Sequence, residues 1–337
     1  MAAVVRMSVP DTSLDSQRLL RAVLPASLVF GVASTTLALL RAVPSGDPTE
    51  LLGVSPLPVV VGVGLATVTA VPLLVALLLV ITAPSRRVAV TGAGLVYAVD
   101  LVSVVGSRLL TPRGPDLGLA VLALPLARPV TVLAVATAVW LAYHGGYERL
   151  AELTGEAVRH PLFAQIDDTH LGPGLTLRRG LVAVGVAGLV GAGGLVATGG
   201  LYDLLVAVGR LGTVGSGTVA FPARNPGEVG VPLARLPARW LVEASVLLAV
   251  LFVAGPRRST RDLLKGLGLL VGVQSAVILV PAFLPPVDPV FLLGARGPLA
   301  TALPDAILLV GLAVGVRLLG RDESGPQVER TTATADS

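Results

Sequence analysis

Long apolar segments, each close to the length of a membrane-spanning helix, dominate this chain. Hydrophobic residues fill 53% of its 337 positions, and charged residues fill only 14%. A soluble domain usually carries about 25% charged residues, so this chain has too few to cover an ordinary water-facing surface. Lipid offers the backbone no hydrogen bonds, so only helices and closed barrels can span a bilayer. The segments are continuously apolar rather than alternating, which predicts helices.

Eight segments approach the twenty or so helical residues that the hydrocarbon core of a bilayer requires. They are Ala22–Leu40, Val59–Ile81, Val88–Leu110, Val130–Tyr147, Gly180–Val206, Pro237–Gly255, Gly266–Leu284 and Ala300–Leu319. The predicted fold class is therefore all-α, a polytopic transmembrane helical bundle of about eight spans. We expect the first segment to be retained, because acidic residues precede it and no convincing small-residue cleavage site follows it.

The segment Leu117–Leu126 is apolar but too short to span a bilayer. We interpret it as an interfacial or re-entrant piece on the outer side, with a ninth span as the alternative. Residues 1–320 form a single integral membrane domain in this interpretation. The polar segment 321–337 lacks periodic apolar positions, which predicts a disordered cytoplasmic tail.

The distribution of basic residues predicts the orientation. With eight spans, one side of the membrane receives nine of the 25 basic residues, and the other side receives the remaining 16. The nine are Arg41, Arg108, Arg113, Arg128, Arg210, Arg224, Arg235, Arg239 and Arg296. The richer side is expected to face the cytoplasm, so the chain is a multi-pass protein of the cell membrane with both termini cytoplasmic.

Two stretches, Leu74–Pro112 and Leu247–Pro286, resemble each other. Each contains a span, an Arg-Arg turn, a second span with a central polar residue, and a closing proline. Three extra residues after the second Arg pair place Asp100 opposite Gln274. A 4+4 parallel repeat, as in some transporters, is one interpretation. The alternative is that apolar helices joined by Arg-Arg turns look alike through composition.

Asp100 is the strongest candidate for chemistry, because it falls near the middle of a predicted span. An ionisable side chain there costs about 2.5–3.5 kcal/mol on insertion scales and usually faces protein or water. Ser103 and Ser107 share its helical face. We expect no Lys, Arg or His at comparable depth, and a carboxyl buried without a cation can serve as a proton carrier. The alternative is structural: Asp100 bonds to Gln274, Ser275 or a carbonyl and holds helices together.

Two acidic residues and a glycine-rich span are interpreted first as structural features. Glu243 and Asp305 fall near the outer ends of spans and are expected to anchor at the interface, with Glu243 paired to Arg239. The fifth span contains the small-residue series Ala183, Ala187 and Gly191, which favours close helix packing. The paired glycines 193–194 and 199–200 leave open a helix that breaks around a substrate.

The largest inner loop, His144–Arg179, combines two features. Residues 147–160 intersperse apolar and charged positions, which predicts a short amphipathic helix on the membrane face or a contact for a cytoplasmic partner. His160, Asp167, Asp168 and His170 follow. Their spacing matches no helical metal-ligand pattern, so a solvated turn is the preferred interpretation.

No recognised catalytic or cofactor motif is present in the sequence. The chain has no cysteine, no phosphate-binding loop, no H-E-x-x-H and no G-x-S-x-G. We therefore assign no catalytic residue, no metal and no cofactor. The arginines are dispersed at helix ends, as in membrane anchoring, so nucleic acid is not expected as a partner. The sequence does not indicate an oligomeric state.

Three functions remain open. The first is a transporter or permease-like protein, whose central polar path would include Asp100, Ser103, Ser107, Gln274 and Ser275. The second is a non-catalytic membrane subunit that docks a cytoplasmic partner through the 144–179 loop. The third is an intramembrane enzyme that uses Asp100 or the His/Asp group of that loop.

Overall fold

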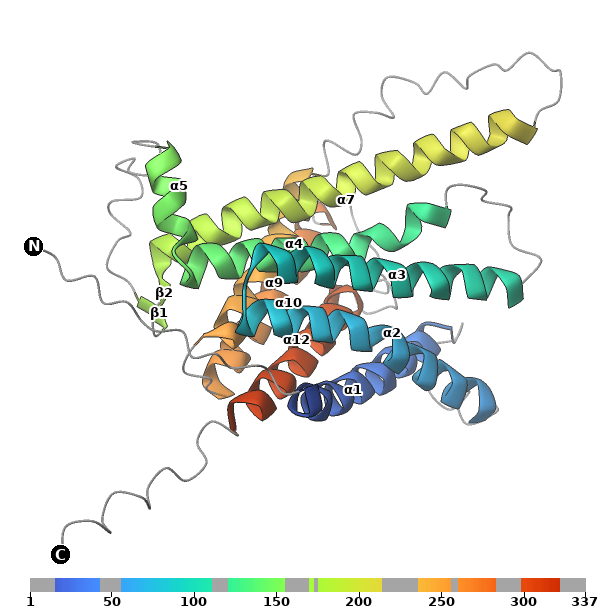
Figure 1. Cartoon of the computed structure of the whole chain (residues 1–337), viewed down its shortest axis with the longest axis horizontal. Coiled ribbons are helices and arrows are strands. Elements are labelled where there is room, and N and C mark those ends of the chain that lie inside the picture. The colour runs from blue at the N-terminus through green and yellow to red at the C-terminus, as the bar shows by residue number, and fades with distance from the viewer. Residues whose placement is uncertain are drawn as a thin grey trace, which may run out of the picture.

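The computed structural model describes residues 16–42, 56–110, 121–154, 170–172, 175–213, 236–255, 260–282 and 298–321. Eight long helices dominate this described part of the chain (Figure 1). They are α1 (Ser16–Ala42), α2 (Pro56–Thr82), α3 (Arg86–Leu110), α4 (Ala127–Tyr143), α7 (Leu177–Thr213), α9 (Leu236–Ala254), α10 (Thr260–Ala282) and α12 (Pro298–Arg321). The architecture is all-α, apart from one small two-stranded sheet.

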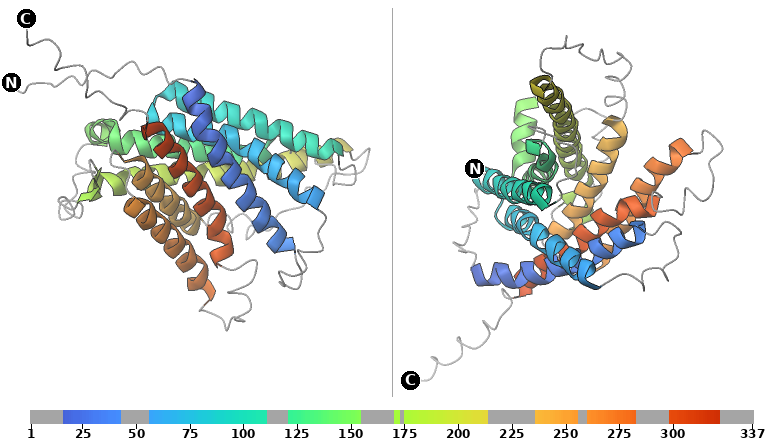
Figure 2. Two further views of the ribbon diagram at one scale, coloured as in Figure 1. Left: turned by 90° about the horizontal axis from the view of Figure 1, so that it is seen from below. Right: turned by 90° about the vertical axis from the view of Figure 1, so that its right-hand side faces the viewer.

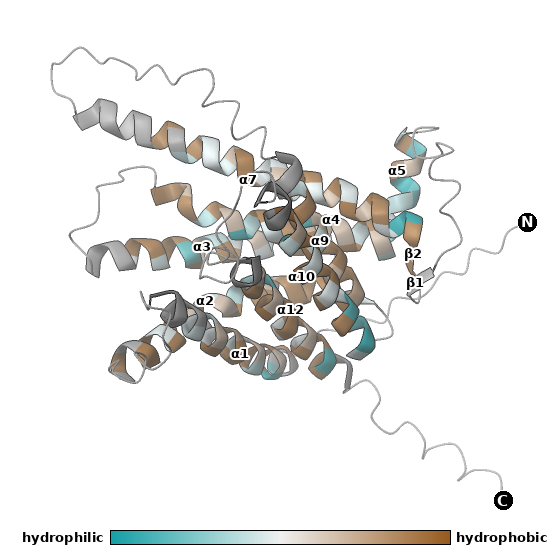
Figure 3. Ribbon diagram, turned by 180° about the vertical axis from the view of Figure 1, so that it is seen from behind, coloured by the Kyte–Doolittle hydropathy of each residue, from teal (hydrophilic) through white to brown (hydrophobic). Residues whose placement is uncertain are grey.

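Each of the eight helices overlaps one of the eight predicted apolar segments. By length and composition, six of the described helices can cross a bilayer: α1, α2, α3, α4, α7 and α12. The apolar part of α9, Trp240–Ala254, is shorter. Helix α10 carries Arg261, Asp262 and Lys265 in its first turns. Figure 3 shows apolar residues along most of the helices, which is the composition of an integral membrane protein.

The eight helices form a closed ring in which each packs against the next, and α12 returns to α1 (Figure 2). Four of them, α2, α4, α9 and α12, also contact one another around the centre. The other four, α1, α3, α7 and α10, each pack between two of these inner helices. The chain therefore alternates between an outer and an inner helix.

Small residues allow the helices to approach closely, because a larger side chain would collide with the neighbouring backbone. A Cβ atom added at Gly92 of α3 would lie 3.0 Å from the Cβ of Ala76 in α2. One added at Gly266 of α10 would lie 3.3 Å from the carbonyl oxygen of Ala249 in α9. The core around these contacts is filled by buried leucine, valine and alanine side chains.

Helix α7 shows which interpretation of the glycine-rich span is correct. Ala183, Ala187 and Gly191 are buried, as close packing requires. Gly191 packs against Ala134 of α4, and Gly188 against Trp240 of α9. The helix continues through both glycine pairs without a break. The packing interpretation is confirmed, and the broken-helix alternative is wrong for this structure.

A sharp turn ends α4 four residues earlier than predicted. Gly145 has φ +73°, a left-handed conformation that favours glycine. A Cβ atom at Gly146 would lie 2.6 Å from the Trp140 ring, so this position also requires glycine. The turn directs α5 (Gly146–Thr154) across the end of α4. The pairing of β1 (His170–Gly172) with β2 (Leu175–Thr176) then leads into α7.

The short apolar piece before α4 is folded beside the bundle. Residues 121–126 form 3₁₀ turns that end in η3 (Leu124–Leu126). The η3 segment contacts α3, α4 and α7, and the Tyr97 hydroxyl of α3 donates a hydrogen bond to the Leu122 carbonyl at 3.1 Å. These residues run directly into α4, so the described part of the segment adds no separate span. Residues 117–120 lie outside the described ranges.

Candidate functional site

An ion pair joins α3 to α4 within the apolar bundle. Nη1 of Arg128 donates to Oδ1 of Asp100 at 2.8 Å. The Asp100 side chain is 9% exposed and that of Arg128 is 40% exposed. The same Nη1 lies 3.5 Å from the carbonyl oxygen of Thr69 in α2. Arg128 therefore bonds to two neighbouring helices, and its outer part remains accessible.

The expectation that no cation lies at the depth of Asp100 is wrong. The predicted fourth span begins at Val130, which leaves Arg128 outside it among the residues of the outer side. Proline is tolerated in the first turn of a helix, and α4 in fact begins at Ala127. Helix α3 extends to Leu110, so the start of α4 lies alongside the middle of α3. The missed signal was an arginine immediately before a proline that opens an apolar run.

Of the two serines predicted to share the helical face of Asp100, the structure describes the side chain of Ser103 but not that of Ser107. Ser103 donates a hydrogen bond to the Val99 carbonyl of its own helix at 2.9 Å, so its hydroxyl is satisfied locally. The side chain of Ser107 lies outside the described residues, although its backbone belongs to α3. The role of these serines in a polar path stays a prediction.

A second polar contact joins α10 to α12. Nε2 of Gln274 donates to Oδ2 of Asp305 at 2.8 Å. Gln274 is only 3% exposed, and Ser275 beside it is partly buried. The partly buried Asp305 carboxylate accepts this hydrogen bond from the neighbouring helix, and its anchoring at the membrane interface stays a prediction. Asp305 follows Pro304, which lies inside α12.

The structure does not bring Asp100 and Gln274 to one another. Asp100 bonds to Arg128, and Gln274 bonds to Asp305. Helix α3 packs on α2 and α4, whereas α10 packs on α9 and α12. Both residues therefore occupy outer helices and contact the inner helix that follows in the chain.

Polar contacts also link α7 to α9. The Trp240 indole N–H donates to the carbonyl oxygen of Gly185 at 3.1 Å. The Glu243 carboxylate lies against Gly191, where an added Cβ atom would be 3.3 Å from Oε2. The predicted partner of Glu243, Arg239, has a side chain outside the described residues. Its pairing with Glu243 therefore stays a prediction.

The His/Asp group of the inner loop falls mostly outside the described ranges. His160, Asp167 and Asp168 lie there, and only the backbone of His170 is described, as the first residue of β1. Within the described ranges, no cluster of three or more potential metal ligands occurs. Helix α5 is placed by an ion pair between Glu148 and Arg179, and the Arg179 guanidinium lies 5.6 Å from the Tyr147 ring centroid.

Comparisons with protein-family models, with curated proteins and with solved structures gave no match. The functional argument therefore depends on the chain's own geometry. This geometry provides several interhelical polar contacts in the described bundle, among them the ion pair of Asp100 with Arg128 and the hydrogen bond of Gln274 to Asp305.

Proposed function

We propose that this protein is a proton-coupled carrier of the cell membrane, with eight spans arranged as two four-helix halves. The observation that carries the proposal is the ion pair between Asp100 and Arg128 inside apolar helices. Ionisable side chains within a bilayer are costly and usually belong to a substrate, ion or proton pathway. In this proposal α9 and α10 also cross the membrane, in addition to the six helices long and apolar enough to do so.

The order of helix contacts fits a repeat of four helices, as it also fits a shorter unit of one outer and one inner helix. Helices α1, α2, α3 and α4 would correspond to α7, α9, α10 and α12. Each contact within the first set, such as α2 with α3 or α2 with α4, has a counterpart in the second. The contacts between the halves also correspond, since α4 packs on α7 as α12 packs on α1. An even-numbered unit gives a parallel repeat, with both halves inserted in the same direction.

Corresponding residues support the same repeat. The contact of Gly92 with Ala76 matches that of Gly266 with Ala249. The alignment that produces this match also places Asp100 opposite Gln274. Their partners, Arg128 and Asp305, both follow the outer helix and sit on the next inner helix. The matched glycine contacts, with a buried polar side chain at the corresponding position of each outer helix, support a repeat over a likeness through composition.

The proposed movement is of one half against the other. Small residues lie at the two interfaces between the halves. Gly191 of α7 faces Ala134 of α4, and Gly311 of α12 faces the backbone of Ala26 in α1. Both polar contacts lie within a half. Protonation of Asp100 would remove its charge, break the ion pair and release the Arg128 guanidinium from α3. That change would couple proton uptake to the packing of α3 against α4.

The proposed orientation places both termini in the cytoplasm. The α2–α3 turn, α5 and the C-terminal end of α12 lie at one end of the bundle (Figure 1). Described basic residues cluster at this end, among them Arg86, Arg87, Arg149 and Arg317. Cytoplasmic segments are enriched in arginine and lysine, which supports the assignment.

Asp100→Asn tests the proposal. Proteoliposomes containing trapped pyranine would receive amino acids, sugars and organic acids, one class at a time, and pyranine fluorescence would report proton movement. We expect one class to drive acidification by the wild-type protein and Asp100→Asn to abolish it while leaving folding intact. Asp262→Asn is a matched control, because Asp262 lies at the start of α10 near Lys265. The absence of acidification with every class, or full activity of Asp100→Asn, would refute proton coupling through this residue.

One observation favours a docking subunit as the second candidate. Leu153 on the amphipathic helix α5 is 85% exposed, and a large exposed apolar side chain on such a helix can mark a contact surface. Replacement of Leu153 by Ser would then reduce co-purification of a cytoplasmic partner, whereas Asp100→Asn would leave co-purification unchanged. An unchanged set of co-purifying proteins would reject this alternative.

A further inference from the structure

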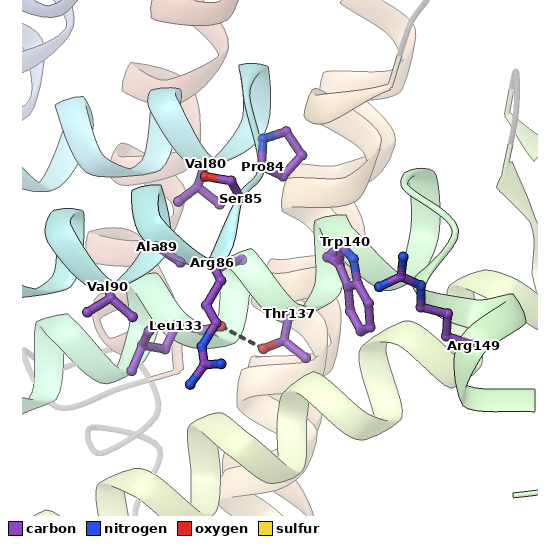
Figure 4. A pocket seen from close by; sticks show the side chains of 11 residues that line it. Val80, Pro84, Ser85, Arg86, Ala89, Val90, Leu133, Thr137, Trp140 and Arg149 are labelled. Atoms are coloured by element: carbon purple, nitrogen blue, oxygen red, sulfur yellow. Dashed lines mark hydrogen bonds between the residues drawn. The ribbon is translucent and has the colours of Figure 1, made fainter. Parts of the chain in front are cut away.

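A cavity of about 590 Å³ opens at the end of the bundle where α2 turns into α3. Its lining comes from that turn, from α4 and from Arg149 of α5 (Figure 4). The volume falls within the range of roughly 300–1,000 Å³ that ligand pockets occupy. It is separate from the contact between Asp100 and Arg128, since neither residue lines it.

Local sequence features place two arginines at this cavity. The Ser85 hydroxyl accepts a hydrogen bond from the Val88 N–H and caps α3, so Arg86 is held at the first position of the helix. On the other side, the Gly145-Gly146 turn brings α5 back toward Trp140. Arg149 then follows in the first turn of α5. Figure 4 shows Arg86 and Arg149 on opposite sides of Thr137 and Trp140.

The charged side chains that line the cavity are two arginines, and none is acidic. Arg86 and Arg149 supply two guanidinium groups, and Ser85 and Thr137 supply hydroxyls. None of the residues that line the cavity is a carboxylate. Guanidinium groups present a planar set of donors that matches the oxygens of phosphate. A negatively charged phosphate group therefore suits this cavity.

Two apolar side chains of the lining are exposed on the outside of the bundle. Val90 of α3 and Leu133 of α4 both line the cavity and are 58% and 37% exposed. Both belong to helices that are long and apolar enough to cross a bilayer, so their exposed surface faces lipid chains in an embedded protein. Trp140 lies between this apolar surface and Arg149 (Figure 4), a position typical of tryptophan at a membrane interface.

We propose that this cavity binds an anionic phospholipid of the cytoplasmic leaflet. The lipid phosphate lies between Arg86 and Arg149, and its acyl chains run along the surface of Val90 and Leu133. A basic pocket between helices on the cytoplasmic side is a common site for anionic headgroups. A soluble anion would use the arginines but would leave the adjoining apolar surface without a partner. The proposal rests on the membrane insertion and the orientation proposed above, and it does not require transport.

Fluorescence quenching of Trp140 tests this site. The chain has two tryptophans, so Trp240→Phe provides a background in which Trp140 is the only one, and the phenyl ring can still pack on Gly188. The protein is reconstituted with phosphatidylglycerol or phosphatidylcholine whose acyl chains are brominated. We expect phosphatidylglycerol to quench Trp140 at lower mole fraction, with a relative affinity on the order of tenfold or more from two arginines.

Substitutions in the same background identify the groups responsible. Arg86→Gln with Arg149→Gln should remove the preference for phosphatidylglycerol, whereas Arg86→Lys with Arg149→Lys should keep most of it. Arg87→Gln is the matched control, because Arg87 lies in the same turn but does not line the cavity. The lysine variant and the control also show whether a lost preference reflects lost charge or lost folding.

Three results would overturn the proposal. One is equal quenching of Trp140 by the two lipids. Another is a preference that persists in the double glutamine variant. The third is loss of the preference in the intact cavity when excess inorganic phosphate is added, because this would identify a site for a free anion rather than a lipid. Resistance of the preference to inorganic phosphate is the expected result.

Discussion

The contact between α3 and α4 and the contact between α10 and α12 resemble each other in geometry and differ in charge. In both, a buried side chain of an outer helix bonds at 2.8 Å to a residue of the following inner helix. The first contact joins a carboxylate to a guanidinium. The second joins an amide to a carboxylate, so its negative charge has only a neutral donor in this bond.

Comparison of the two contacts distinguishes two effects: holding neighbouring helices together and neutralising a buried charge. Either contact fixes an outer helix against an inner one, because an unsatisfied polar group in an apolar environment is costly. Only the first also neutralises a charge inside the bundle. If the first half carries the proton-linked step and the second half mainly holds its helices together, substitutions in the two contacts should have unequal effects.

The largest loss of stability is expected from Arg128→Gln. It leaves the buried Asp100 carboxylate without its cation, and breaking a fully buried pair costs roughly 3–5 kcal/mol. Arg128 is partly exposed, which reduces the expected loss to about 2–3 kcal/mol. Unfolding in mixed detergent–SDS micelles measures it. The added replacement Asp100→Asn should recover part of the loss, and a double variant that is additive would show that the two residues are not coupled.

An intermediate and similar loss in both halves is expected from Gly92→Ala and Gly266→Ala. Each new methyl group meets atoms of the neighbouring inner helix at 3.0–3.3 Å, and overpacking costs about 1–3 kcal/mol. Gly94→Ala and Gly268→Ala are matched controls on the same helices, because nothing lies within 4 Å of a Cβ atom there. The same unfolding assay should show little change for the controls. A loss confined to one half would argue against the repeat.

The smallest loss is expected from Gln274→Leu, which removes the amide donor to Asp305 while keeping an apolar side chain of similar size. Interhelical hydrogen bonds in membranes contribute about 0.6 kcal/mol on average, with a maximum of about 1.7 kcal/mol. Unfolding of this variant should therefore shift less than that of Arg128→Gln. An equal or larger shift would contradict the proposed difference between the two contacts.

The sequence predicted the positions of the helices well, because long apolar runs have one stable conformation in lipid. It predicted the site only in part. Asp100 was singled out by its depth in an apolar run, which is a local property. Arg128 was missed, because its depth depends on where α4 begins relative to α3. The contact between Asp305 and Gln274 was also missed, because the two residues are 31 positions apart in the chain.

The sequence by itself determined the class of fold, the number and approximate limits of the long helices, and the excess of arginine at alternate junctions. These follow from hydropathy and from the need to satisfy the backbone within each helix. Only the tertiary structure decided that the helices alternate between outer and inner positions, that Asp100 pairs with Arg128, and that Arg86 and Arg149 share a cavity. Such contacts depend on the axial offset and rotation of packed helices, which side-chain packing sets and hydropathy does not record.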